Sequence, residues 1–244
     1  MNKKKWIALG VFALLILGMF IYFLINEFPS DFLKEEELIG KLNSVDEKIE
    51  VEVIQDLIFM DDKHVFVPFI SKDEDYGFSL WKWKNGKWHL SEKRVSGLIN
   101  FIQLKENDPT SYYFVWNLPG NNISAIKLYM IRERDYRITN GLPNYQPRVQ
   151  MERLYKKDTT YGVEPLPDEM LEVYQEIIEM NDNVEDFFMF PINNDLYFTS
   201  NIYDENGEVI VININGYSYF GDVMIKSDDL FPNVPINDLE YPNR

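Results

Sequence analysis

The feature that most constrains this chain is an uninterrupted apolar run from Trp6 to Ile25, which contains no charged side chain. At about 1.5 Å per residue, a helix of this length reaches roughly 30 Å, the thickness of the hydrocarbon core of a bilayer. A cleaved secretory signal has a shorter apolar core, of about 7–15 residues, followed by small residues at the cleavage site. No small-residue triplet follows Ile25. The sequence therefore predicts a retained transmembrane helix over residues 6–25.

The charges on either side of the apolar run predict its orientation. Three lysines occupy positions 3–5, whereas Glu27 and Asp31 follow the run. Basic residues flanking a membrane span remain on the cytoplasmic side. We therefore expect a single-pass protein of the cell membrane, with residues 1–5 as its cytoplasmic end and the bulk of the chain extracytoplasmic. So short a cytoplasmic end cannot itself pass on a signal, so a sensor would need a separate membrane partner.

The portion beyond the apolar run is strongly acidic and contains no cysteine. All 40 acidic residues but only 21 of the 24 basic residues lie after Ile25. A surface of this charge repels phosphate backbones, which excludes nucleic acid as a partner. The absence of cysteine excludes disulfides, thiolate metal sites and a cysteine nucleophile. Cysteine-poor exported proteins are common in Gram-positive bacteria, so we expect an envelope protein of a bacterium.

Most of this portion has the residue pattern of antiparallel β-sheet. Over residues 49–54, Ile49, Val51 and Val53 alternate with Glu50, Glu52 and Ile54, as in a half-buried strand. Two dense apolar runs, 57–60 and 65–70, flank a short polar segment and predict a hairpin. A second hairpin is predicted around Asn85-Gly86, because this dipeptide favours the type I′ turn. The same dipeptide predicts a third hairpin at Asn206-Gly207.

Two further helices are expected outside the apolar run. One is predicted over residues 31–42 with Ser30 as its N-cap, and the other over 168–180, where two acidic residues suit its positive end. The remaining strands are predicted at 111–118, 123–134, 149–155, 196–204, 209–215 and 217–225, and residues 94–105 fit either a helix or a strand. We predict a transmembrane helix and a mainly β (α+β) ectodomain with antiparallel sheets, about nine to eleven strands and two or three helices.

Prolines suggest how the ectodomain is divided. The segment Glu164-Pro165-Leu166-Pro167 is the best candidate boundary. It would separate a mainly β region over 26–164 from an α+β region over 165–228, which the sequence allows either as a second domain or as part of the same one. Residues 229–244 are expected to form an irregular tail.

The hairpin around Asn85-Gly86 holds the candidate binding residues. A two-residue turn places Trp83 opposite Trp88 and Trp81 opposite Leu90, so that these side chains share one face. The other face carries Lys82, Lys84, Lys87 and His89. The interpretation that we favour is that the aromatic face packs on the core. The functional hypothesis is an exposed platform of Trp81, Trp83 and Trp88 on which sugar rings or a partner's side chains stack, beside a basic strip suited to carboxylate or phosphate.

Catalytic and metal-binding motifs are absent from the sequence. His64 and His89 are the only histidines, and neither H-E-x-x-H nor G-x-S-x-G occurs. The acidic clusters, including Asp204-Glu205-Asn206-Gly207-Glu208, lack the ligand spacing of a calcium loop. We therefore expect no metal or other cofactor. A glycosidase needs only two carboxylates about 5–9.5 Å apart, and a chain with 40 acidic residues leaves that alternative open.

The sequence thus favours a non-enzymatic, membrane-anchored interaction or binding module that has a protein partner in the bacterial envelope. One alternative is an envelope glycan hydrolase that uses paired carboxylates. Another is an extracytoplasmic ligand sensor with a separate signalling partner.

Overall fold

The computed structural model describes residues 3–46, 48–95, 99–106, 108–120, 122–139, 141–156, 158–181, 196–210, 217–221, 225–230 and 239–240. Over these residues the chain is mainly β, with antiparallel sheets and three α-helices. The helices are α1 (Lys3–Glu27), α2 (Glu35–Val45) and α3 (Asp168–Asn181). The expected mainly β fold with two or three helices is therefore confirmed.

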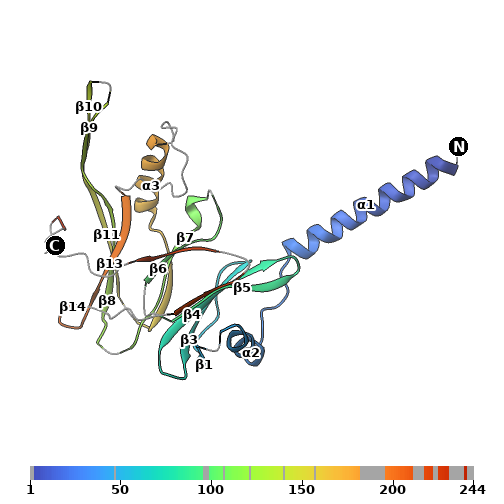
Figure 1. Cartoon of the computed structure of the whole chain (residues 1–244), viewed down its shortest axis with the longest axis horizontal. Coiled ribbons are helices and arrows are strands. Elements are labelled where there is room, and N and C mark those ends of the chain that lie inside the picture. Colours follow the sequence, from blue (N-terminus) through green and yellow to red (C-terminus); the bar gives the residue numbers. More distant parts are fainter. Residues whose placement is uncertain are drawn as a thin grey trace.

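Helix α1 projects from the rest of the molecule as one continuous rod (Figure 1). Its described apolar side chains are exposed. Among the residues that the structure describes, no helix is found with the length and apolar character needed to cross a membrane. The transmembrane helix over residues 6–25 stays a prediction.

Sheet A contains the first half of the β structure. Its strands are β1 (Val51–Ile54), β3 (His64–Ser71), β4 (Tyr76–Lys84), β5 (Lys87–Val95) and β15 (Tyr217–Phe220) in that order, with β2 (Ile58–Asp61) also paired to β3. The β2–β3 hairpin is the one predicted from the two apolar runs. The β4–β5 turn has φ of 53° at Asn85 and 77° at Gly86, the two positive values that a type I′ turn requires.

Two four-stranded sheets complete the body of the molecule. Sheet B has the order β12 (Tyr161–Pro165), β7 (Tyr112–Asn117), β6 (Ile99–Gln103) and β16 (Lys226–Leu230), with the 3-10 helix Pro109–Ser111 before β7. Sheet C has the order β11 (Val149–Lys156), β8 (Ala125–Arg132), β13 (Leu196–Tyr203) and β14 (Val209–Ile210). A separate pair, β9 (Asp135–Thr139) and β10 (Leu142–Gln146), extends beyond sheet C (Figure 1).

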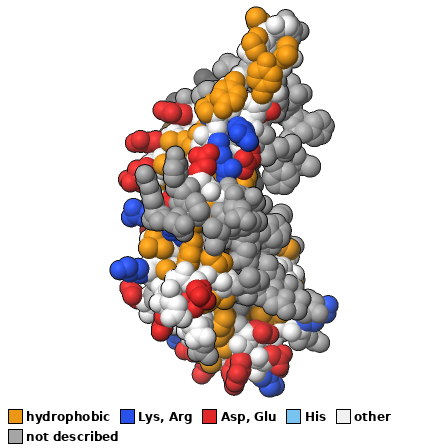
Figure 2. Space-filling view, turned by 90° about the vertical axis from the view of Figure 1, so that its left-hand side faces the viewer, with side chains coloured by type: hydrophobic (Ala, Val, Ile, Leu, Met, Phe, Trp, Pro, Cys, Tyr) orange, Lys and Arg blue, Asp and Glu red, His pale blue; other side chains and the backbone are white. Residues whose placement is uncertain are grey.

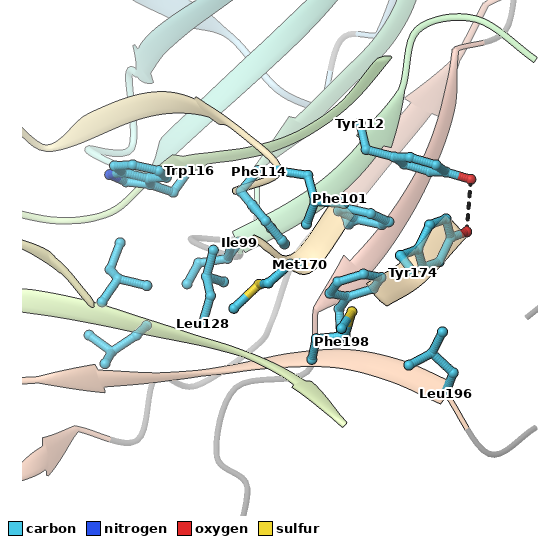
Figure 3. Packing of buried hydrophobic residues seen from close by; sticks show 14 of the residues in the cluster. Ile99, Phe101, Tyr112, Phe114, Trp116, Leu128, Met170, Tyr174, Leu196 and Phe198 are labelled. Atoms are coloured by element: carbon cyan, nitrogen blue, oxygen red, sulfur yellow. Dashed lines mark hydrogen bonds between the residues drawn. The ribbon is translucent and has the colours of Figure 1, made fainter. Parts of the chain in front are cut away.

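Sheet B is the central layer, and both of its faces are buried. Successive residues of a strand point to opposite faces, so Ile102 and Val115 pack toward sheet A while Phe101 and Phe114 pack toward sheet C. Helix α3 closes the second of these cores, where the Tyr174 hydroxyl donates to that of Tyr112 at 3.1 Å (Figure 3). Residues 94–105, which the sequence left ambiguous, contain the end of β5 and the whole of β6.

The predicted start of the second helix is wrong. Helix α2 begins at Glu35 instead of Asp31, and Ser30 does not cap it. Residues 28–34 contain no helix. The aromatic ring of Phe32 packs on sheet A, and the Ser30 carbonyl accepts a hydrogen bond from the Trp88 indole at 3.1 Å. Contacts with a distant hairpin thus outweigh the local capping signal.

Some predicted elements extend past the described residues. The predicted strands 209–215 and 217–225 are seen as β14 and β15, and their remaining residues lie largely outside the described part of the chain, as does most of the predicted tail over 229–244. The third hairpin is confirmed, because β13 pairs with β14 around Asn206-Gly207. The candidate domain boundary at 164–167 stays a prediction.

Gly162 provides a sharp test of the packing between β7 and β12. Gly162 lies opposite Trp116, and an added Cβ would be 2.1 Å from the Trp116 ring. We expect Gly162→Ala to lower the free energy of unfolding by about 1–3 kcal/mol, as overpacking does. Urea denaturation measures this. Gly40, which is exposed in α2 with no atom within 4 Å of the added Cβ, is the control, and Gly40→Ala should stabilise the protein by about 0.5–1 kcal/mol.

Candidate interaction surface

The three tryptophans of the β4–β5 hairpin have the predicted register but are not accessible. Trp83 pairs with Trp88, and Trp81 pairs with Leu90. Trp81 is 1% exposed, and Trp83 and Trp88 are each 6% exposed. They belong to the core between sheet A and α2. The hypothesis of an exposed platform on Trp81, Trp83 and Trp88 is therefore wrong, and the core-packing interpretation describes them.

The cover over these tryptophans comes from the segment between α1 and α2. The Phe32 ring meets Trp81 edge-on at 5.7 Å between centroids and Trp88 at 5.1 Å. Leu38 and Leu42 of α2 are fully buried in the same cluster. The aromatic face of the hairpin thus holds the segment that leads out of α1. The hairpin sequence gives no indication of this cover, since the covering residues lie about fifty positions earlier.

The opposite face of the hairpin carries the predicted basic strip. Lys84 and Lys87 are exposed beside the turn, and Lys82 and His89 are half-buried. The His89 ring nitrogen lies 3.1 Å from the Lys84 carbonyl oxygen. Burial lowers the pKa of Lys82, and the neighbouring charge of Lys84 lowers it further. Positive charges therefore do crowd this end of sheet A.

The most exposed apolar surface described outside α1 lies on β9 and β10, which we call the arm. Ile138 is 65% exposed and Leu142 is 72% exposed. Tyr136 and Tyr145 are 60% and 63% exposed. Figure 2 shows hydrophobic side chains gathered at the protruding upper end of the molecule, which is the arm of Figure 1. Contiguous exposed apolar surface of this kind marks interaction sites.

The register of the arm places most of these side chains on one face. Tyr136 pairs with Tyr145, and Ile138 pairs with Pro143. Directly paired residues share a face, and so do residues two apart in a strand. These four side chains therefore form a single apolar face. Over the described residues, β9 and β10 pair only with each other, so no further described strand continues their sheet.

A polar cluster holds the base of the arm against sheet C. Glu133 accepts a hydrogen bond from the Tyr197 hydroxyl at 3.0 Å and pairs with Arg148 at 3.3 Å. Gln150 exchanges two hydrogen bonds, both of 2.9 Å, with the backbone of Glu240. The two segments that lead into and out of the arm are thus fixed to the body. The arm is a positioned extension of the β8–β11 hairpin.

Sequence reasoning missed the arm although a signal was present. Asn140-Gly141 is the same dipeptide that predicted two other hairpins, and Gly141 has φ of 80°. Pro143 obscured the signal, because proline cannot donate to a strand ladder and is confined to sheet edges. In a two-stranded arm both strands are edges, so Pro143 fits.

Asp61 and Asp204 do not have the environment of an acid catalyst. Burial tends to raise the pKa of Asp61, but the hydrogen bond from His64 at 2.7 Å and the His64 charge lower it overall. The backbone N–H groups of Glu208 and Asn206 lower the pKa of Asp204, which therefore shapes a turn. A glycosidase acid needs a raised pKa. Among the described residues, no cluster of three or more metal-ligating side chains is found.

The buried ion pair of β5 also has a structural role. Glu92 pairs with Arg94, and the Arg94 guanidinium donates to Asn100 of β6 at 2.8 Å. All three side chains are buried. These contacts join sheets A and B. In this buried environment, charged groups are stable only when they are paired.

Comparison with models of protein families, with curated protein sequences and with solved structures finds no match to this chain.

Proposed function

We propose that this protein is a membrane-anchored, extracytoplasmic interaction module of a bacterial envelope, and that the arm contacts its protein partner. The observation that carries the proposal is the exposed apolar face of Tyr136, Ile138, Pro143 and Tyr145 on a base held by polar contacts. A monomeric soluble surface rarely presents such side chains together. Large aromatic side chains are also the residues that dominate binding energy at protein interfaces.

The anchor in this proposal is the apolar run of residues 6–25. It is supported by the absence of charge over twenty residues, by the three lysines that precede it and by the acidic residues that follow it. With this orientation sheets A, B and C are extracytoplasmic. The arm and α1 project from different sides of the body (Figure 1), which leaves the arm free to meet a partner away from the bilayer.

The charge around the arm indicates the chemistry of the partner. Between residues 132 and 153 the chain has five arginines and three acidic residues, although its overall net charge is −16. This local excess of two positive charges (five minus three) favours a partner with an apolar groove bordered by carboxylates. Other copies of the arm are disfavoured as occupants, since like charges would face each other.

Site-specific crosslinking in intact cells tests this function directly. A photoreactive phenylalanine analogue at Tyr145 of the arm should form a discrete adduct with another protein. The same analogue at Phe220, which is 52% exposed on β15, is the matched control and should give no adduct of that mass. Equal crosslinking from both positions would mean that the arm is not the contact surface.

We expect the double variant Tyr136→Asp with Ile138→Asp to abolish that adduct at Tyr145. Each substitution places a carboxylate in an apolar contact, which costs far more than losing the side chain alone. The folded protein should be little affected, within about 0.5 kcal/mol, because both side chains are exposed. Leu154→Asp, a like change at a half-exposed position of β11, should leave the adduct intact. Adduct yield and thermal unfolding together separate these outcomes.

A further inference from the structure

The last turn of α1 is tied to the turns of two hairpins. The Lys63 ammonium, in the β2–β3 turn, lies 2.9 Å from the Glu27 carboxylate at the end of α1. The Lys63 carbonyl accepts a hydrogen bond of 2.8 Å from the backbone N–H of Trp83, which is next to the β4–β5 turn. Both hairpin turns therefore lie beside the end of α1, as Figure 1 shows for β4 and β5.

Exposed lysines and exposed aromatic rings lie around this junction. Lys84 and Lys87 are exposed, and Phe28 and Phe59 are 66% and 54% exposed. Together with Lys63 we call these residues the junction surface. Asp61 is occupied by its contact with His64, and Lys105 approaches it at 4.0 Å. The exposed acidic residues near the junction surface are Glu27, which pairs with Lys63, together with Asp31 and Asp62.

This composition matches the headgroup region of a membrane. Aromatic rings settle at the boundary between hydrocarbon and water, and lysines beside a membrane span are attracted to anionic lipid. The remainder of the ectodomain has a large negative charge, which an anionic bilayer repels. Attraction of the junction surface to the bilayer, together with repulsion of the remaining ectodomain surface from it, would orient the domain on its anchor.

We infer that the junction surface binds the headgroups of anionic lipids in the bilayer that holds α1, so that the domain rests on the membrane at its β2–β3 and β4–β5 turns. This inference rests on the proposed membrane anchor. The docked segment 28–34 supports it, because the contacts of Phe32 and Ser30 with the tryptophans fix the end of α1 to the domain. The junction surface therefore remains close to the bilayer surface in which α1 ends.

The absence of native cysteine permits a clean test on the full chain. A single dye is attached through Asn85→Cys in the β4–β5 turn, and the protein is reconstituted into vesicles of phosphatidylcholine with or without phosphatidylglycerol. Spin-labelled headgroups quench a dye that lies beside them. Glu205→Cys, in the exposed β13–β14 turn, is the matched control. We expect quenching at position 85 to be several-fold stronger than at position 205 in the anionic vesicles.

Charge reversal supplies the decisive comparison. The pair Lys84→Glu and Lys87→Glu should remove the excess quenching, whereas Arg153→Glu with Lys156→Glu, exposed in β11, should retain it at the same net charge. The lipid inference would be overturned if quenching at position 85 were the same with and without phosphatidylglycerol. It would also be overturned if this quenching persisted in the variant with Lys84→Glu and Lys87→Glu. Flotation of the vesicles distinguishes the two failures: a chain that floats without quenching contradicts this inference alone, whereas a chain that does not float overturns the anchor as well.

Discussion

Replacing Trp81 with alanine is expected to lower the free energy of unfolding by about 3–5 kcal/mol, the range for large aromatic side chains removed from a core. Trp81 is the largest fully buried side chain described. Its ring contacts Phe32, and its indole N–H donates to the Ser79 hydroxyl at 2.9 Å. The substitution therefore leaves a cavity and also removes the partner of a buried hydroxyl.

Urea denaturation of the full chain in detergent, followed by circular dichroism, measures the effect of Trp81→Ala. Tyr136→Ala on the arm is the control, since it also removes an aromatic ring but from an exposed position, and it should change stability by no more than about 0.5 kcal/mol. Trp81→Ala should also make residues 28–34 more susceptible to proteolysis, because Phe32 loses its support. A loss below about 1 kcal/mol would show that this cluster is not a core.

Lys93→Met is expected to be nearly as damaging, although it replaces a charge with an apolar side chain of similar length. Lys93 is fully buried, and its ammonium donates to the carbonyls of Leu42 at 2.8 Å, Asp46 at 3.2 Å and Ile49. These carbonyls lie at and after the end of α2, where a helix is electronegative. Each orphaned buried acceptor costs about 1–3 kcal/mol, so we expect a loss of about 3 kcal/mol.

The comparison for Lys93→Met is Lys72→Met. Lys72 pairs with Glu50 at the surface at 3.0 Å, where a salt bridge is worth about 0–1 kcal/mol. If both variants lower the free energy of unfolding by the same amount in urea denaturation, then the buried contacts of Lys93 with carbonyls stabilise the protein no more than a surface salt bridge does.

Lys93 should also make stability depend on pH. Burial lowers the pKa of Lys93 to about 8, below its ordinary value of about 10.4. Between these values the unfolded chain holds a proton that the folded chain has released, so stability rises with pH across this window. Urea midpoints measured from about pH 7.5 to 9.5, below the ordinary pKa of tyrosine, should therefore increase. Lys93→Met should remove this rise, and a rise that persists in the variant would assign it to another group.

Local patterns predicted the hairpins because both the turn and the strands depend on neighbouring residues. Asn85-Gly86 defines a turn that places Trp83 opposite Trp88, and period-two alternation assigns the faces. The start of α2 was predicted wrongly for the converse reason, because residues 28–34 follow contacts with Trp81 and Trp88 from a distant part of the chain.

The candidate surfaces also differ in whether local sequence patterns predict them. The basic strip of Lys84 and Lys87 was predicted correctly, because charged side chains opposite an apolar strand face remain at the surface. The arm was missed, since Tyr136 and Tyr145 have the pattern of an ordinary strand. Whether an aromatic strand face is covered depends on which elements pack against it, and alternation along the strand does not contain that information.

By itself, the sequence determined the apolar run of residues 6–25, the acidic charge, the mainly β class and the pairing within the hairpins, all of which depend on composition or on residues a few positions apart. The tertiary structure decided that Trp81, Trp83 and Trp88 are covered while the arm is exposed, and that Lys93 is buried under the end of α2. The physical reason is that burial is a property of the whole packed assembly: the same aromatic hairpin is a core or a binding surface according to what distant segments place upon it.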